Sequence, residues 1–163
     1  RVVFFVGTEQ ENTNARLLFS ERVRLNLQSR EITDSTATFK LKSAFEWAAD
    51  GLGTVSYHGA DLTTLTEVAS SNTESIRRLD YGGGSFVFNN LSQLSELKTF
   101  IRKKDQTISQ LGFSAEELKS FVAIIGPAGV ERIVPFGEAL SFNVIWDGYN
   151  LVDVFTRRVF CKT

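Results

Sequence analysis

The hydrophobic positions of this chain fall into blocks with two different spacings. Val2 to Val6 is an unbroken apolar run that Gly7 ends, which is typical of a strand covered on both faces. From about Glu11 to Ser29 the apolar residues recur every three or four positions, which predicts an amphipathic helix. The expected inward side of that helix carries Ala15, Leu18, Phe19, Val23 and Leu27. The chain therefore opens as a strand followed by a helix.

The next block predicts a second helix and two short strands. A three-to-four spacing of apolar residues runs from Asp34 to Ala49, and Gly51 and Gly53 would end the helix. The residues that carry this spacing are Ala37, Leu41, Ala44, Phe45 and Ala48. Thr54 to His58 and Leu65 to Ala69 then alternate like strands on either side of a polar turn.

Two further strands and a helix are predicted in the second half. Phe86 to Phe88 and Gln106 to Leu111 have strand-like composition. Between them, Asn90 and Gln93 have the spacing of a capping pair that opens a helix. The expected inward side of this helix carries Leu94, Leu97, Phe100 and Ile101.

The next helix has the clearest start signal in the sequence. Ser114 and Glu117 form the pattern S-x-x-E of a capping box, and Gly126-Pro127 ends the apolar spacing that follows. The residues expected to face the core are Leu118, Phe121, Val122 and Ile125. A strand at Ile133 to Phe136 and a last helix near Leu151 to Val159 complete the order.

Strands that alternate with helices predict an α/β fold with a mostly parallel sheet flanked by helices. The length of 163 residues fits one domain, so residues 1–163 are interpreted as a single domain. The chain has no Met and begins at Arg1 with a strand already under way, which indicates a fragment of a longer protein.

The composition of the chain argues against several classes of function. The net charge of -1 gives no electrostatic reason to expect nucleic acid or an anionic membrane as a partner. No apolar run approaches the roughly 20 residues of a membrane-spanning helix, and no leader opens the chain. Cys161 is the one cysteine, which excludes an internal disulfide and favours a reducing, cytoplasmic location.

The residues alone do not assemble a complete active site. Only His58 and Cys161 offer nitrogen or sulfur ligands, so no metal site is expected. His58 and Asp61 have the chemistry of a base and its orienting acid, and with Ser85 they would make a hydrolase. An ordinary structural histidine is the competing interpretation. The glycine run 82–84 fits either a plain turn or a phosphate cradle, and both interpretations stay open.

Three segments resemble a known enzyme family. Asp105-Gln106-Thr107-Ile108, then GFSAEEL at 112–118 and GVERIVPFGEALSFNVIWDGYNLVDVFTRRV at 129–159, are similar to the C-terminal region of bacterial acyl-CoA reductases. This family includes the fatty acid reductase subunit of bacterial luminescence, and it belongs to the aldehyde dehydrogenase superfamily. The resemblance implies a three-layer α/β fold like the catalytic domain of aldehyde dehydrogenases. The opening strand and helix resemble those that directly follow the catalytic cysteine there, which would place the nucleophile upstream of Arg1.

The resemblance also implies binding residues. The segment Asp80-Tyr81-Gly82-Gly83 is similar to the superfamily's acid-Phe-Gly-Pro turn, so Asp80, Gly82 and Gly83 are expected at the nicotinamide cofactor. Pro135-Phe136-Gly137 is similar to the Pro-Phe-Gly-Gly loop at the substrate entrance, with Glu138 in place of the second Gly. Trp146 matches the reductase branch. It is interpreted either as a residue of the core or as a contact for the acyl chain.

The implied activity is the reduction of a fatty acyl thioester to an aldehyde by NADPH, through an acyl group bound to the cysteine. The parent chain would be the enzyme, and this fragment alone would be inactive. The expected partners are acyl-CoA or an acyl-protein thioester, an acyl-transferring protein and a further copy of the chain. The alternative is a non-catalytic binding or oligomerisation module of the same fold.

Overall fold

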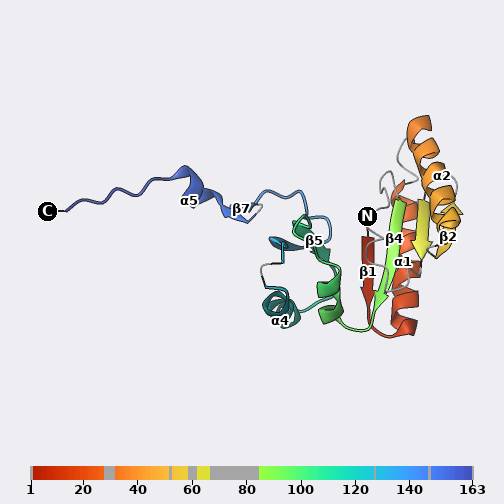
Figure 1. The fold of residues 1–163 in the computed structure, drawn as a ribbon, viewed down its shortest axis with the longest axis horizontal. Helices are drawn as coiled ribbons and strands as arrows, with labels where there is room; N and C mark the ends of the chain where they lie inside the picture. Colours follow the sequence, from red (N-terminus) through yellow and green to blue (C-terminus); the bar gives the residue numbers. More distant parts are fainter. Residues whose placement is uncertain are drawn as a thin grey trace. The chain divides into compact units, whose positions relative to one another are not determined.

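A computed structural model describes residues 2–27, 32–51, 53–58, 62–66, 85–126, 128–146 and 148–162. The chain divides into two compact units, Arg1–Leu97 and Lys98–Thr163. Figure 1 shows the ribbon of both and labels many of their helices and strands. Parallel strand pairs occur in each unit together with helices, so the predicted α/β class is confirmed.

The first unit is built on a four-stranded sheet in the order β1-β4-β3-β2. These strands are β1 (Val2–Val6), β2 (Thr54–His58), β3 (Leu62–Thr66) and β4 (Ser85–Leu91). β4 pairs in parallel with both β1 and β3, and β2 is antiparallel to β3. The predicted bounds of β1 and β2 are confirmed. β4 is longer than the predicted Phe86 to Phe88, and β3 lies three residues earlier than predicted, its expected end at 67–69 falling outside the described residues.

Helix α1 (Glu9–Leu27) begins two residues earlier than predicted because of a cap that the spacing analysis missed. The Thr8 backbone N–H donates to Glu11 Oε2 at 2.8 Å, and the Glu11 N–H donates back to Thr8 Oγ1 at 3.3 Å. This is the reciprocal arrangement of a capping box. The side-chain and backbone hydrogen bonds from Thr8 hold the pKa of Glu11 below its ordinary value.

The side of α1 that meets the sheet includes the predicted Phe19 but differs from the prediction at other positions. Phe19 packs edge-to-face on three sheet residues, Phe5, Phe86 and Phe88, with ring centroids 5.4–6.2 Å apart. Asn12 is buried, and its amide Nδ2 donates to Gly7 O at 3.1 Å and to Leu91 O at 3.3 Å. These contacts turn the helix so that Ala15 and Leu18 are exposed, against the prediction. An amide that ties two strand ends therefore decides the rotation of α1.

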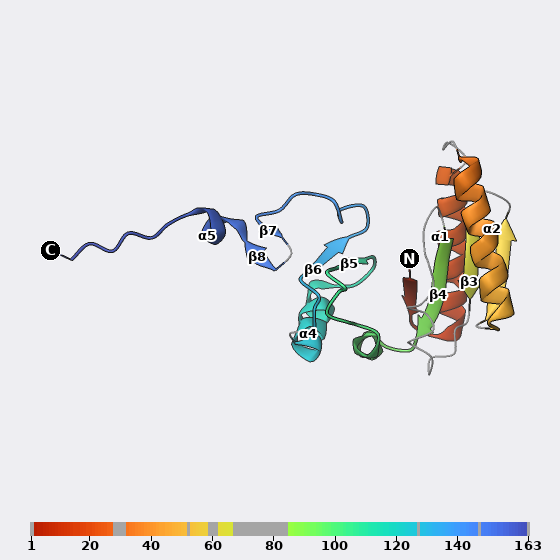
Figure 2. The ribbon, with the colours of Figure 1, turned by 45° about the horizontal axis from the view of Figure 1, so that its top comes forward.

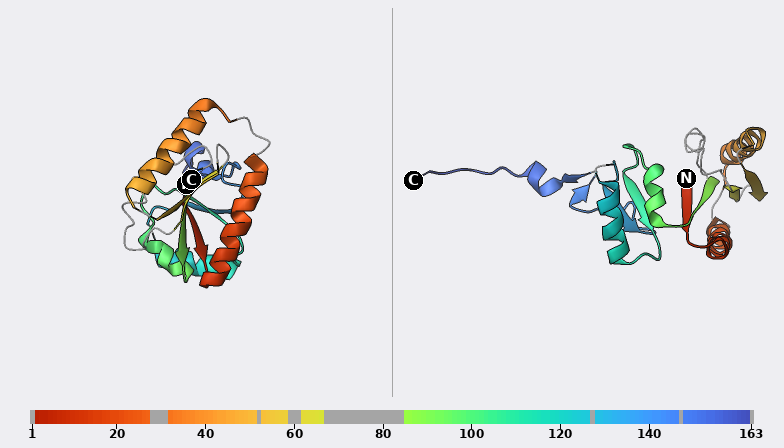
Figure 3. Two further views of the ribbon diagram at one scale, coloured as in Figure 1. Left: turned by 90° about the vertical axis from the view of Figure 1, so that its right-hand side faces the viewer. Right: turned by 60° about the horizontal axis from the view of Figure 1, so that its bottom comes forward.

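Helix α2 (Asp34–Ala49) has the predicted bounds. Its first turn is capped by Thr33, whose hydroxyl accepts from the Thr36 N–H at 3.3 Å, and Gly51 with φ +64° follows its end. The buried side chains are Lys40, Ser43, Ala44 and Trp47. Leu41 and Phe45, which carried the predicted spacing, are exposed. Helices α1 and α2 lie alongside the sheet (Figure 3).

A short 3-10 helix, η1 (Leu94–Thr99), follows β4 where the sequence predicted a longer helix capped by Asn90. The prediction of this cap is wrong because Asn90 belongs to β4 and pairs with Phe5. The Gln93 N–H instead donates to Glu96 Oε1 at 3.1 Å. Of the residues predicted to face inward, Leu97, Phe100 and Ile101 are buried.

The second unit begins with a parallel pair of strands and one helix. β5 (Thr107–Gln110) pairs with β6 (Arg132–Pro135), and α4 (Ala115–Ile125) lies between them in sequence. The predicted capping box is confirmed, since Ser114 N–H donates to Glu117 Oε2 at 2.8 Å and Glu117 N–H donates to Ser114 Oγ at 3.3 Å. Phe121 and Ile125 are buried as predicted, whereas Val122 is 51% exposed.

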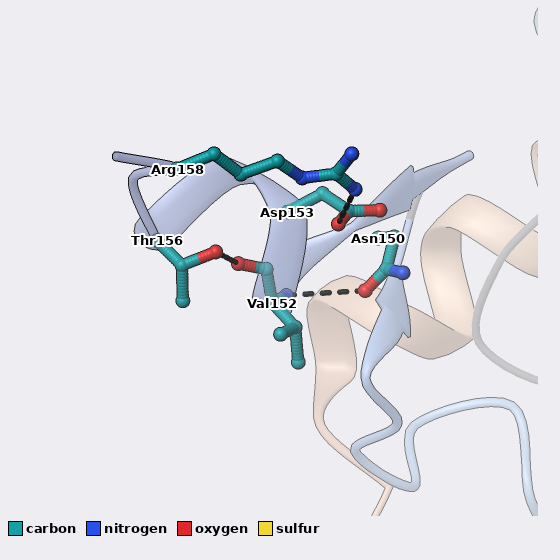
Figure 4. Close-up of polar contacts among 5 residues, drawn as sticks. All are labelled: Asn150, Val152, Asp153, Thr156 and Arg158. Atoms are coloured by element: carbon teal, nitrogen blue, oxygen red, sulfur yellow. Dashed lines mark hydrogen bonds and ion pairs between the residues drawn. The ribbon is translucent and has the colours of Figure 1, made fainter. Parts of the chain in front are cut away.

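The end of the chain holds less regular structure than predicted. A two-residue strand β7 (Ile145–Trp146) pairs with β8 (Tyr149–Asn150), and α5 covers Leu151–Phe155 where a helix to Val159 was expected (Figure 2). The helix is held by short-range bonds: Val152 N–H donates to Asn150 Oδ1 at 3.1 Å and Thr156 Oγ1 donates to Val152 O at 2.6 Å (Figure 4). Its C-cap residue, Thr156, is already extended, which ends the helix.

Within the described part of the chain, every helix is too short or too polar to cross a bilayer.

Candidate functional site

The expected cofactor residues Asp80, Gly82 and Gly83 lie outside the described residues. The strand that follows them in sequence is described, and Ser85 at its start is 2% exposed. Residue Val2 of β1 lies opposite Val87 of β4 in a parallel register. The amino ends of these two strands therefore lie at the same edge of the sheet.

The expected entrance residues form a turn at the carboxyl end of β6. Phe136 is 46% exposed, and its N–H donates to Gln110 O at 3.1 Å, which extends the pairing of β5 and β6 by one bond. Gly137 has φ +92°, a conformation that favours glycine, and the Glu138 N–H closes the turn on Pro135 O at 3.1 Å. Pro135 and Gly137 are exposed, so this turn presents an accessible surface.

Trp146 lies in a cluster that sequence reasoning did not predict. The guanidinium carbon of Arg132 stands 4.4 Å from the centroid of the Trp146 ring, and the Phe142 ring stacks on Trp146 at 6.1 Å with an angle of 21° between the planes. Arg132 is only 9% exposed, and its Nη2 donates to Ser141 O at 3.2 Å. Trp146 itself is half-buried. A cation and a second aromatic ring thus cover the indole.

The two halves of the expected substrate site lie at opposite ends of β6. Arg132, which holds Trp146, is the first residue of the strand, and Pro135 is the last. Three residues of strand correspond to roughly 10 Å along the backbone. The described contacts therefore place the turn at 135–137 and Trp146 in separate surroundings. Arg132 is the residue that the sequence could have indicated, because a charged residue at a strand position otherwise apolar calls for a specific partner.

The structure describes only part of the hydrolase alternative. His58 ends β2 and pairs with Leu62 of β3, while Ser85 starts β4 and pairs with Thr63 of β3. Two strand spacings of about 4.8 Å therefore separate the backbones of His58 and Ser85. The side chain of Ser85 is also buried, and Asp61 lies outside the described residues.

The described residues contain no group of three or more metal-ligating side chains. Cys161 is an exposed, free thiol. No protein-family model, no curated protein sequence and no solved structure matches this chain.

Proposed function

We propose that this chain is part of an NADPH-dependent reductase that converts fatty acyl thioesters to fatty aldehydes through an acyl group bound to a cysteine. In this proposal the catalytic domain has three layers, like that of aldehyde dehydrogenases. The parent protein works in the reducing cytoplasm, where its nucleophile stays a thiol. Its substrate is acyl-CoA or an acyl group carried on a partner protein.

The observation that carries the proposal is the parallel pairing of β1 and β4. The resemblance puts a nucleophile just before β1, and it puts the ribose-binding acid Asp80 just before β4. Because the amino ends of both strands lie at one edge of the sheet, the two groups would enter the site from the same edge. Hydride transfer requires this proximity between the thioester carbon and the nicotinamide.

The resemblance also assigns roles to individual residues. Asp80 holds the nicotinamide ribose, and Gly82 and Gly83 let the backbone approach the cofactor. The exposed turn of Pro135, Phe136 and Gly137 is proposed at the substrate entrance, with Trp146 as a candidate contact for the acyl chain. In the proposed chemistry, the acyl group passes from the donor thiol to the cysteine. Hydride transfer then releases the aldehyde and restores the cysteine thiolate.

The first test is to determine the coding sequence upstream of Arg1, over about 20 codons, because nucleophile and strand are neighbours in this mechanism. A cysteine there allows a direct assay of the parent protein with a long-chain acyl-CoA. Mass spectrometry should then detect the acyl-enzyme, and NADPH oxidation should depend on the acyl thioester. Replacement of that cysteine by serine should abolish both signals, and Asp80→Asn should raise the KM for NADPH while the acyl-enzyme still forms. The absence of an upstream cysteine would contradict the proposal.

A second candidate function, a non-catalytic binding or oligomerisation module, is favoured by the exposed apolar residues of the C-terminal arm (residues 136–162). Among the described residues, the five most exposed large apolar side chains, between 77% and 90% accessible, are Leu140, Phe142, Phe155, Val159 and Phe160. Monomeric proteins rarely expose contiguous apolar patches above a few hundred Å². A second copy of the chain is the occupant that this candidate commits to.

Light scattering after gel filtration tests this second candidate. The parent chain should show a mass that rises with concentration to a dimer or larger, and the double variant Phe155→Ser/Phe160→Ser should stay monomeric. Leu17→Ser is a matched control, since Leu17 is 67% exposed on α1 of the other unit. Its mass should equal that of the unchanged protein. A wild-type protein that stays monomeric at all concentrations would remove this candidate without affecting the reductase proposal.

A further inference from the structure

Arg132 is a buried cation with few protein partners. It is 9% exposed, its Nη2 donates to Ser141 O at 3.2 Å, and its guanidinium lies over the Trp146 ring. Within the residues that the structure describes, no carboxylate lies at ion-pair distance from it. A guanidinium has five N–H donors, and a buried charge is ordinarily paired. One backbone carbonyl and one ring face occupy part of the fork of Arg132. None of its nitrogens is buried without a partner, so its remaining N–H donors face solvent.

The neighbouring positions on the sheet are neutral hydroxyl residues. Arg132 lies opposite Thr107 in the parallel register of β5 and β6, and the alternation of side chains places Ser109 on the same face. The carboxyl carbon of the adjacent Glu131 lies 3.2 Å from where a Cβ on Gly148 would be, two positions along the chain from Trp146. Among the described residues, neither Glu131 nor any other carboxylate is at ion-pair distance from Arg132. The face that holds the cation therefore offers further hydrogen-bond donors.

We infer that Arg132 is the centre of a site for an oxyanion, a phosphate monoester or a carboxylate group, lined by Thr107 and Ser109 and backed by Trp146. The planar fork of arginine matches such groups through two parallel N–H···O bonds. Stacking on Trp146 fixes the plane of the guanidinium and leaves its edge for the ligand. This site shares Trp146 with the proposed acyl contact, but it uses none of the residues assigned to the cofactor or to the nucleophile.

The two tryptophans of the chain provide a probe and an internal control. Trp146 contacts Arg132, whereas Trp47 is 1% exposed on α2 of the first unit. In the ¹⁵N-labelled chain, inorganic phosphate added at constant ionic strength should shift the indole N–H signal of Trp146 in a saturable manner. The signal of Trp47 should stay in place. Acetate is the second probe, and the ratio of the two affinities identifies the preferred oxyanion. The Arg132 Nε–H signal should move with the same midpoint.

Variants separate binding at Arg132 from other effects. Arg132→Gln should abolish the saturable shift, and Arg132→Lys, which keeps the charge but loses the fork, should weaken it by about tenfold. Arg158→Gln is the matched control, since the side chain of Arg158 is 96% exposed. It should bind phosphate like the unchanged chain. A Trp47 signal at its original position shows that the first unit remains folded in each variant.

Three results would overturn the inference. One is a Trp146 signal that does not saturate with either anion in the unchanged chain. Another is a shift that persists in Arg132→Gln, which would place the anion elsewhere. The third concerns Asp147, which lies outside the described residues. If only the variant Asp147→Asn binds the anion, the carboxylate of Asp147 neutralises Arg132 in the unchanged chain. The first and third results are measured on proteins that keep Arg132. They can therefore contradict the inference even if the variants of Arg132 do not fold.

Discussion

Strand β4 and the C-terminal arm both carry several large apolar side chains, and their surroundings differ completely. Val87, Phe88 and Leu91 of β4 are at most 3% exposed, whereas Phe155 and Phe160 of the arm are at least 81% exposed. β4 is paired on both sides, by β1 and β3, and Phe19 of α1 covers one of its faces. The arm is held by two-residue strands and one short helix. Both regions carry large apolar side chains, so the number of neighbouring helices and strands decides whether those side chains are buried.

The largest expected effect tests this comparison with one substitution in each region. Phe88→Ala removes a ring that is 3% exposed and that contacts Phe5 and Phe19 edge-to-face at 5.3 and 5.7 Å. The loss of buried area and the cavity should lower the free energy of unfolding by about 3–5 kcal/mol. Phe155→Ala, at an 81% exposed position, should change it by less than about 0.5 kcal/mol. Urea unfolding measures both, and equal effects would show that the arm is buried in solution.

A smaller effect is expected from the buried amide that joins β1, β4 and α1. Asn12→Ala leaves Gly7 O and Leu91 O without the donor that now bonds each of them. Loss of a buried hydrogen-bonded group should reduce the free energy of unfolding by about 1–3 kcal/mol. Asn14→Ala, exposed on the same helix, is the control and should have little effect. If urea unfolding finds the two variants equally stable, Asn12 does not fix the rotation of α1.

The same comparison explains which parts of the fold the sequence predicted. β1, α2 and the capping box of α4 were predicted because each is specified by local signals, an apolar run or a cap at fixed spacing. The inward sides of α1 and α2 were predicted less well. Phe19 was predicted inward and packs on the sheet, but the buried Asn12 bonds to Leu91 O far along the chain, and spacing alone contains no information on such a partner.

The candidate site follows the same rule. The resemblance predicted a substrate entrance at 135–137; the structure shows an exposed turn there, and the entrance role stays a prediction. The contact between Arg132 and Trp146 was missed because 14 positions separate them and the resemblance implied no contact between the two. Predicting it would have required the register of β6 and the turn that returns the chain to it, both of which are tertiary features.

The capping boxes of α1 and α4 should each make the stability of the protein depend on pH. Hydrogen bonds from Thr8 lower the pKa of Glu11, and those from Ser114 lower the pKa of Glu117, each from an ordinary value of 4.5. Because the folded pKa lies below the unfolded one, the stabilisation is present above pH 4.5 and is lost as the pH falls through the folded pKa. NMR titration should show that Ser114→Ala raises the pKa of Glu117 and leaves that of Glu11 unchanged. Thr8→Ala should do the reverse, and a variant that moves both would contradict independent caps.

The smallest expected effect lies in the arm itself. Arg158 Nη2 and Asp153 Oδ1 are 3.8 Å apart, and their side chains are 96% and 61% exposed (Figure 4). At this separation and exposure, water and salt screen the attraction, and holding two long side chains together costs entropy. Arg158→Ala should therefore leave the urea unfolding midpoint unchanged at low and at high salt. A salt-dependent loss of stability would instead mean that the arm is packed against other residues in solution, where the pair would be less screened and the contrast with β4 would disappear.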